Sequence, residues 1–206
     1  MKGVCMDSNV WTWLSGLLVS ISGIYYAVLV YRREAPCNPI SWAAWGIVGV
    51  AIFLTSETTF GMNAITFGAI NPFAVAAIGA WRQLERAETP TRREIVSGLL
   101  ALIAIGAWII SRTGGYPSEW ILGLSIAADM IPLWPILVGA WTRPQDDKPF
   151  AWLLFGVGFG ISSFGLHEIS VFTLAVPAYM FVGSMTVALP LASYRWQRRA
   201  PIREWA

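Results

Sequence analysis

The chain has 206 residues, of which 56% are hydrophobic and 13% charged, with a mean hydropathy of +0.57 and a formal net charge of +2. Because soluble domains carry about 25% charged residues, this composition excludes an ordinary soluble globular protein and indicates an integral membrane protein. No basic tract of the kind that binds nucleic acid is present, so no nucleic-acid partner is expected.

Seven apolar runs are long enough to be predicted as crossings of a bilayer core about 30 Å thick. In chain order they are residues 11–30, 40–56, 64–81, 95–110, 120–141, 150–164 and 170–194. The first run lacks the short apolar region and cleavage pattern of a signal peptide, so we expect it to be retained. No polar tract is long enough for a soluble domain, and residues 1–206 are therefore predicted to form a single membrane domain with the lipid bilayer as its partner.

The basic residues predict the orientation of the chain. Short cytoplasmic loops hold an excess of Lys and Arg, and 12 of the 14 basic residues follow the first, third, fifth or last run. We therefore expect the N-terminus outside and the C-terminus inside, in the inner (cytoplasmic) membrane. Most tryptophans fall at run ends, where they favour the headgroup zone. These expected interface anchors are Trp11, Trp13 and Trp120 outside, and Trp42, Trp81, Trp141, Trp152 and Trp196 inside.

Residues 14–56 match residues 124–166 without a gap, at an offset of 110. The identities include Pro39/Pro149, Trp42/Trp152 and Gly46/Gly156, and Trp45 aligns with Phe155. A repeat predicts a 3+1+3 plan, with repeat one at 11–81, a linker helix at 95–110 and repeat two at 120–194. The linker would leave both repeats in the same orientation, related by an axis along the membrane normal. Two hairpins that each need a Pro at the first helical position are the alternative.

This plan resembles the seven-helix SWEET, SemiSWEET and PQ-loop transporter superfamily. Family members carry proline in the first helix of each repeat, and residues 120–141 contain Pro132 and Pro135. The further combination of Pro39, Ser41, Trp42 and Trp45 with Ala128 and Asp129 looks like a bacterial branch of the superfamily. The resemblance implies an all-α membrane protein that carries a small polar metabolite, such as a sugar, by alternating access around a central cavity.

Asp129 is the main candidate for binding this small-molecule substrate. A carboxylate at bilayer depth costs about 2.5–3.5 kcal/mol on insertion scales, so it is expected to face the bundle interior or a watery cavity. It would bind a hydroxyl or cationic group, or take a proton. The alternative is a packing hydrogen bond through Ser125, one turn earlier on the same helix face.

Prolines beside Asp129 predict a broken helix that lines the cavity. Pro132 and Pro135 each lack an amide hydrogen and free the carbonyl four residues back. Pro72 does the same in the first repeat, where Asn71 adds an amide. Freed carbonyls are tolerated at membrane depth only inside protein or around a cavity. The three prolines are therefore predicted to be hinges, and Asn71 a substrate-binding residue.

Trp134, Tyr25 and Tyr26 could stack on a planar or sugar-like substrate face, with helix packing or lipid contact as the alternative. At the outer ends, Glu57, His167 and Glu168 could form a gate with Arg112, although exposed end charges are the favoured interpretation. Gly156, Gly158 and Gly160 permit close helix approach. That approach could be within the chain or to another subunit of a homo-oligomer.

No cofactor and no catalytic activity are expected. A single histidine excludes multi-histidine metal sites and bis-histidyl haem, and Lys2 and Lys148 lie in predicted loops, so no retinal Schiff base is expected. A channel selective for cations or a ligand-gated sensor stays open. So does a vitamin-precursor carrier of the nicotinamide riboside type, which shares the seven-span parallel-repeat plan and whose ring-bearing cargo suits an aromatic-rich cavity.

Overall fold

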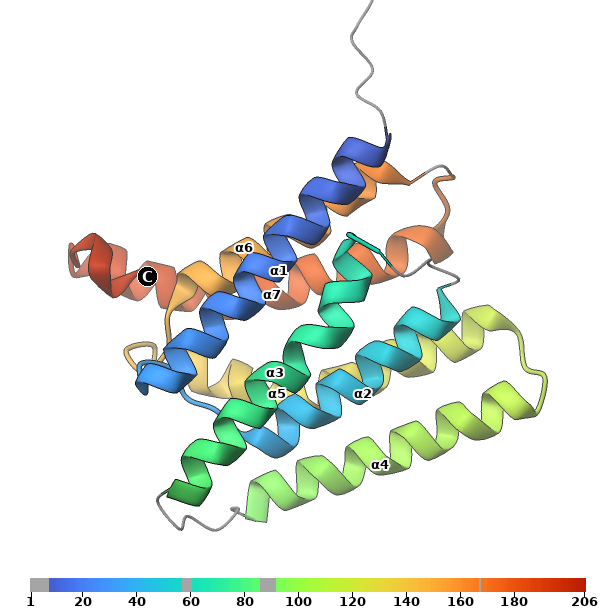
Figure 1. Ribbon diagram of the computed structural model, residues 1–206, viewed down its shortest axis with the longest axis horizontal. Helices are drawn as coiled ribbons and strands as arrows, with labels where there is room; N and C mark the ends of the chain where they lie inside the picture. The colour runs from blue at the N-terminus through green and yellow to red at the C-terminus, as the bar shows by residue number, and fades with distance from the viewer. Residues whose placement is uncertain (1–7, 57–60, 86–91, 167) are drawn as a thin grey trace, which may run out of the picture.

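The computed structural model describes residues 8–56, 61–85, 92–166 and 168–206 (Figure 1). This part of the chain folds into seven α-helices and two short 3-10 helices, without a strand. The elements are α1 (Ser8–Arg32), α2 (Pro39–Thr55), α3 (Ala64–Glu85), α4 (Arg92–Thr113), α5 (Ser118–Thr142), α6 (Pro149–Ser162), η1 (Ser163–Gly165), α7 (Val171–Gln197) and η2 (Ile202–Glu204). Each predicted run coincides with one helix, so the all-α prediction is confirmed.

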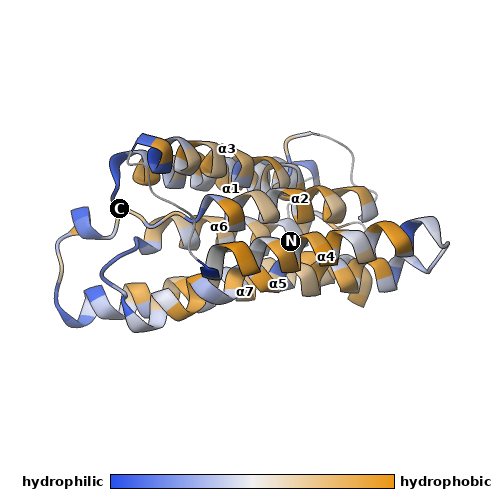
Figure 2. Cartoon of the chain, turned by 90° about the horizontal axis from the view of Figure 1, so that it is seen from below, coloured by the Kyte–Doolittle hydropathy of each residue, from blue (hydrophilic) through white to orange (hydrophobic). Residues whose placement is uncertain are grey.

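Four of the seven helices, α1, α3, α5 and α7, are long and apolar enough to cross a membrane. The shorter apolar helices are α2, the segment Gly98–Thr113 of α4, and α6 with η1. Apolar residues dominate the middle of the helices, and the most hydrophilic residues gather at their ends and in the C-terminal segment (Figure 2). Four candidate spans of this kind are compatible with a membrane protein.

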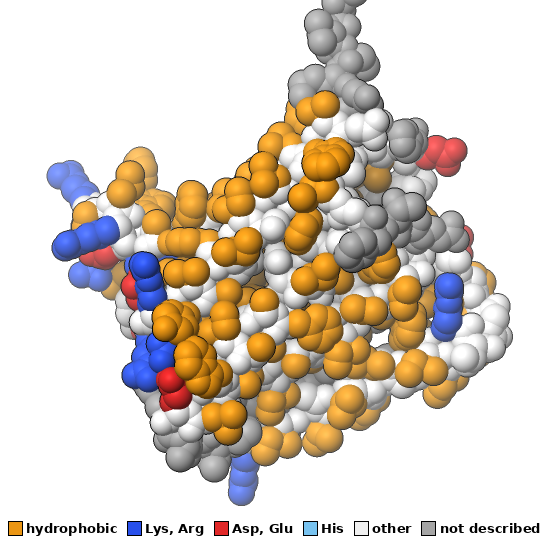
Figure 3. Space-filling view, viewed as in Figure 1, with side chains coloured by type: hydrophobic (Ala, Val, Ile, Leu, Met, Phe, Trp, Pro, Cys, Tyr) orange, Lys and Arg blue, Asp and Glu red, His pale blue; other side chains and the backbone are white. Residues whose placement is uncertain are grey.

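The outer surface is strongly apolar along the helices (Figure 3). Ile24 is 62% exposed, Ile103 68% and Leu189 60%, each near the middle of its helix. Soluble proteins rarely expose contiguous apolar surface on this scale. In the view of Figure 3 most Lys and Arg side chains gather at one end of the molecule, where α1 and α5 finish and the C-terminal segment lies.

Six helices are arranged as a ring of two triplets. In the first triplet α3 packs between α1 and α2, and in the second α7 packs between α5 and α6. The triplets meet along two seams, α1 against α6 and α2 against α5. The remaining helix, α4, packs outside the ring against α2 and α5 (Figure 1).

The helix ends follow the same spacing as the sequence match. Helix α5 begins and ends 110 residues after α1, and α6 together with η1 begins and ends 110 residues after α2. The third helices keep this spacing less closely, since α7 begins 107 and ends 112 residues after α3. Both α2 and α6 start on a proline, Pro39 and Pro149, whose fixed φ and missing amide hydrogen suit the first helical position.

The α1–α6 seam is close enough to interlock the two helices. A Cβ added at Gly158 of α6 would lie 2.8 Å from Val19 Cγ2 and 3.2 Å from the carbonyl oxygen of Ser15. One turn further along α1, the Ser22 hydroxyl donates to the carbonyl of Ala151 at 2.8 Å. Gly156 and Gly160 face α7 instead. The three glycines therefore serve packing inside the chain.

The prediction that the helix around Pro132 is broken is wrong. Helix α5 runs without interruption from Ser118 to Thr142 with both Pro132 and Pro135 inside it, and α3 likewise continues through Pro72. A proline removes one helical hydrogen bond and crowds one carbonyl. In a long helix supported by its neighbours that loss leaves the remaining bonds intact, as is common for membrane helices.

Candidate functional site

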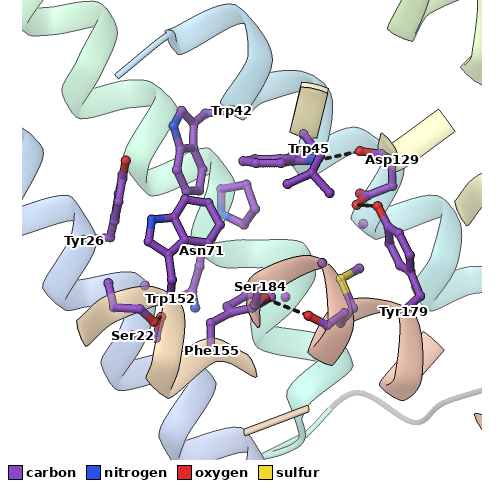
Figure 4. A pocket seen from close by; sticks show the side chains of 18 residues that line it. Ser22, Tyr26, Trp42, Trp45, Asn71, Asp129, Trp152, Phe155, Tyr179 and Ser184 are labelled. Atoms are coloured by element: carbon purple, nitrogen blue, oxygen red, sulfur yellow. Dashed lines mark hydrogen bonds between the residues drawn. The ribbon is translucent and has the colours of Figure 1, made fainter. Parts of the chain in front are cut away.

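A cavity lies inside the ring, between the two triplets. Its volume is about 70 Å³, several times the roughly 10–15 Å³ that one water molecule requires. All six ring helices contribute lining residues, whereas none of the lining residues in the described part of the chain comes from α4. Figure 4 shows the polar and aromatic side chains that converge on this space. Two buried hydrophobic clusters, one around Leu29 and Leu191 and the other around Val19 and Phe159, pack around it.

Asp129, from the middle of α5, is the only Asp, Glu, Lys, Arg or His among the described residues that line the cavity. Asp129 is buried, with 6% of its surface exposed. Oδ2 accepts a hydrogen bond from the Tyr179 hydroxyl at 2.8 Å, and the Asp129 backbone carbonyl accepts one from Trp45 Nε1 at 3.0 Å. Within the described part of the chain, no hydrogen bond or ion pair engages Oδ1. Tyr179 of α7 therefore holds the carboxylate and Trp45 of α2 holds the backbone of the same residue, while one carboxylate oxygen stays available to a ligand.

Four aromatic rings pack together along the cavity wall, from Trp45 beside Asp129 to Tyr26, Trp42 and Trp152 further away. Trp42 lies 4.9 Å from Tyr26, 5.0 Å from Trp45 and 6.2 Å from Trp152, measured between ring centroids. Trp45 connects this cluster to Asp129 through its indole N–H (Figure 4). The positions also follow the repeat, because Trp42 and Trp152 are each the fourth residue of a ring helix that begins on proline.

The expectation that Trp42 and Trp152 anchor the inner interface is wrong. Their exposed fractions are 8% and 7%, and both pack in the core beside the cavity. Trp81, Trp141 and Trp196 are 48%, 66% and 77% exposed and keep the surface positions expected of them. The angular position of each tryptophan around its helix decides the difference, because a residue near a helix end can point inward or outward at the same depth.

Asn71 of α3 lines the cavity beside Pro72, facing α1. Its side-chain Nδ2 donates to the carbonyl oxygen of Val19 at 2.8 Å. The contact depends on Gly23, because a Cβ added there would lie 2.1 Å from Asn71 Cγ. Glycine is thus required at position 23 to let the amide enter the space between α1 and α3.

Gly23→Ala is expected to lower the free energy of unfolding by about 1–3 kcal/mol, the usual cost of overpacking, because Asn71 Cβ would also be only 2.5 Å away. Gly139→Ala in α5 is the matched control, since a Cβ there meets nothing within 4 Å. It should stabilise slightly, by about 0.5–1 kcal/mol, through helix propensity. Thermal unfolding in detergent measures both; equal effects of the two changes would contradict this account.

Beneath the aromatic cluster, Asp147 in the loop before α6 accepts hydrogen bonds from both Tyr26 and Trp152. Oδ2 lies 3.3 Å from the Tyr26 hydroxyl and 3.0 Å from Trp152 Nε1, and Oδ1 accepts from the Lys148 amide at 2.7 Å. Burial raises the pKa of Asp147 to about 6, against the opposing effect of these hydrogen bonds and of the Arg195 charge. The cavity wall is thereby tied to the basic end of the molecule.

Four of the sequence-predicted site residues, Asp129, Asn71, Pro72 and Tyr26, line the cavity. Pro132 is buried in α5 without lining it. Ser125 is also buried, but its hydroxyl donates to the carbonyl of Ile121 at 2.8 Å and makes no bond to Asp129.

The other predicted residues lie elsewhere. Trp134 is 67% exposed, and Pro135 beside it is also exposed. At about 100° per residue, Trp134 projects about 140° around the helix from Asp129 and so points away from the cavity. Leu133 follows Asp129 by four residues, lies on the same helix face, and lines the cavity instead. Tyr25 packs edge-on against Phe150, with 5.7 Å between ring centroids, and leaves the cavity to Tyr26. The proposed outer gate is not described, because Glu57 and His167 lie outside the described residues.

Sequence reasoning missed the lining roles of Tyr179, Trp42, Trp45 and Trp152. The sequence match at an offset of 110 carried a signal for the three tryptophans, because the aligned positions 42/152 and 45/155 are aromatic in both segments and all four residues line the cavity. Tyr179 carried no such signal, and only the packing of α7 against α5 brings its hydroxyl to Asp129.

Comparison of the chain with models of protein families, with curated proteins and with solved structures gave no match. The site itself is thus the basis for inferring a function: a cavity between two helix triplets, with one carboxylate at mid-helix depth beside a cluster of aromatic rings.

Proposed function

We propose that the protein is a multi-pass protein of the inner membrane with its N-terminus outside and its C-terminus inside. The strongly apolar outer surface and the four long apolar helices support a membrane location. In the proposed topology α2, α4 and α6 cross as well, giving seven spans. The concentration of Lys and Arg at the end that carries the C-terminal segment supports the orientation, since short cytoplasmic loops are rich in both.

Two parallel repeats form the ring in this proposal, with α1–α3 as repeat one, α4 as linker and α5–α7 as repeat two. The support comes from the shared spacing of 110 residues between helix ends and from the central place of the third helix in each triplet. Each seam also pairs a first helix with the other triplet's second helix, as a two-fold axis along the bilayer normal requires. This is the plan of the SWEET and PQ-loop transporters that the sequence resembles.

The protein carries a small polar metabolite by alternating access, with the cavity as its binding site. One observation carries this proposal: the cavity lies between the two triplets and holds a mid-helix carboxylate with an unbonded oxygen. Repeat-built carriers bind cargo at such a place, and rocking one repeat against the other exposes the site to each side in turn. No step of chemistry on the cargo is part of the proposal.

A ring-bearing vitamin precursor is a second candidate cargo. The specific observation in its favour is the aromatic lining, to which Tyr26, Trp42, Trp45, Trp152, Phe155 and Tyr179 contribute. A planar ring stacks on such side chains with a favourable energy of roughly 0.5–1.5 kcal/mol for each good pair.

Uptake into proteoliposomes tests the carrier proposal. A panel of radiolabelled sugars, nucleosides, vitamins and small amines should include at least one substrate whose uptake saturates. Asp129→Asn should reduce its kcat/KM at least about tenfold, because a buried hydrogen bond to a charged group contributes roughly 1.5–3 kcal/mol. Asp146→Asn, at a half-exposed loop carboxylate, is the control and should transport normally.

Unchanged uptake by Asp129→Asn would remove the proposed role of the carboxylate. Single-channel currents in planar bilayers, in place of saturable uptake, would identify a cation channel and overturn the carrier mechanism.

A further inference from the structure

The cavity wall carries a carboxyl group without a basic side chain beside it among the described residues. Among the described residues, Asp129 is the only carboxylic acid on the wall, and no Lys, Arg or His lines the space. Tyr179 of α7 is the titratable group that contacts the carboxylate. The Trp45 indole of α2 bonds the backbone carbonyl of the same residue, and α4 carries its charged residues only near its ends. An ionised carboxylate removed from water is costly unless it is paired. Asp129 therefore needs either a proton or a cationic ligand.

Most hydrogen-bond donors on the wall are already engaged within the protein. The Ser22 hydroxyl donates to Ala151, the Ser184 hydroxyl to Met180 and Asn71 Nδ2 to Val19. The indole N–H groups of Trp45 and Trp152 donate to Asp129 and Asp147, and Tyr179 donates to Asp129. Acceptors remain, above all Asp129 Oδ1. Such a wall is complementary to a ligand that brings positive charge and hydrogen-bond donors. It is a poor match for a sugar, because each sugar hydroxyl needs both a donor and an acceptor on the wall.

Aromatic faces complete this complementarity. Trp45 touches both the carboxylate residue and the cluster of Tyr26, Trp42 and Trp152 (Figure 4). A cation near the faces of such rings gains roughly 0.5–2 kcal/mol from each favourable contact. The volume of about 70 Å³ limits the ligand to a compact one in this conformation.

We propose that the cavity binds a compact organic ammonium ion, and that this cation and a proton exchange at Asp129. The proposal rests on the carrier function above and names its substrate class. With the cavity empty, Asp129 holds a proton. When the cation enters, its positive charge replaces that proton, which leaves to the side on which the cavity is open, so one proton is released for each cation bound. Tyr179 keeps its hydrogen bond to Oδ2 in both states.

Two matched pairs of probes test the proposal on the full chain in detergent. Choline is compared with 3,3-dimethylbutan-1-ol, which has carbon in place of the nitrogen, and benzylammonium with benzyl alcohol. Calorimetry measures affinity, and an indicator dye in weakly buffered solution between pH 5 and pH 8 measures proton release. At least one cation should bind roughly tenfold or more tightly than its neutral partner, as expected for a paired charge and cation–π contacts.

Asp129→Asn should remove this preference and the proton release, and Asp146→Asn should retain both. Thermal unfolding of both variants checks that they fold. Neutral partners that bind as tightly as the cations, absence of cation binding, or cation binding without proton release at any pH would each overturn the inference.

The outcomes also separate this inference from the carrier proposal. Saturable uptake of a neutral compound without binding of either cation leaves a carrier with a different substrate. Cation binding with proton release but without uptake leaves the site and removes the carrier. Failure of both binding and uptake removes both.

Discussion

Arg195→Met is expected to lower the free energy of unfolding by about 3–5 kcal/mol, because an unsatisfied buried acceptor costs roughly 1–3 kcal/mol. The Arg195 side chain is buried near the end of α7 and donates to four backbone carbonyls. Nη1 donates to Leu191 at 3.1 Å and to Pro144 at 2.9 Å, Nη2 donates to Asp147, and Nε donates to Glu204. Methionine fills similar space but donates to none of them.

Chemical unfolding in detergent measures this loss, with Arg198→Met as the matched control. Arg198 is exposed one turn away and donates only to the Tyr194 hydroxyl within the described chain, so its change should stay within about 0.5 kcal/mol. Arg195→Lys should restore little, since an ammonium cannot reproduce the planar set of donors. Equal stability of the Arg195→Met and Arg198→Met variants would refute the stabilising role of the Arg195 hydrogen bonds.

Asp147 should make the stability of the protein fall as the pH rises from about 4 to about 6. Burial raises the pKa of Asp147 from 3.8 to about 6, so the folded state keeps a proton that the unfolded state has released. The stabilisation from that proton is complete below about pH 4 and is lost as the pH passes the folded pKa. At about 1.4 kcal/mol per pKa unit, the change is on the order of 3 kcal/mol.

The test compares unfolding of the natural protein and Asp147→Asn across pH 3.5–7.5. The asparagine variant should lack the decline between pH 4 and pH 6. Asp146→Asn removes the neighbouring, half-exposed carboxyl and should leave the decline unchanged. A decline that survives in Asp147→Asn would assign it to another group.

The positions of the helices along the chain were predictable because few physical requirements determine them. A span needs a long apolar run, and the structure places α1 to α7 on the seven runs, with Pro39 and Pro149 marking two helix starts. The uninterrupted course of α5 was not predictable. Whether a proline such as Pro132 breaks a helix depends on how neighbouring helices support the residues around it.

The site was predictable only where a side chain has no acceptable place in lipid. Asp129 and Asn71 are such residues, and both face the cavity. Aromatic residues suit the lipid boundary and the core equally well, so the inward Trp42 and the outward Trp134 could not be assigned by depth alone. The angle of each residue around its helix separates Leu133 from Trp134, but it becomes useful only when one residue on the inner face is known.

The two seams of the ring are built differently, and this difference has a mechanical consequence. Along α1 and α6 the backbones interlock at Gly158, and Ser22 bonds directly to the α6 backbone. Along α2 and α5 the bridge is the Trp45 indole, bonded to the same residue whose carboxylate faces the cavity. Separating α1 from α6 therefore means pulling apart interlocked backbones, whereas separating α2 from α5, which α4 also contacts from outside, breaks a side-chain hydrogen bond at Trp45. Any motion that parts α2 from α5 must break this bond and shift α4, and a ligand at Asp129 lies beside it.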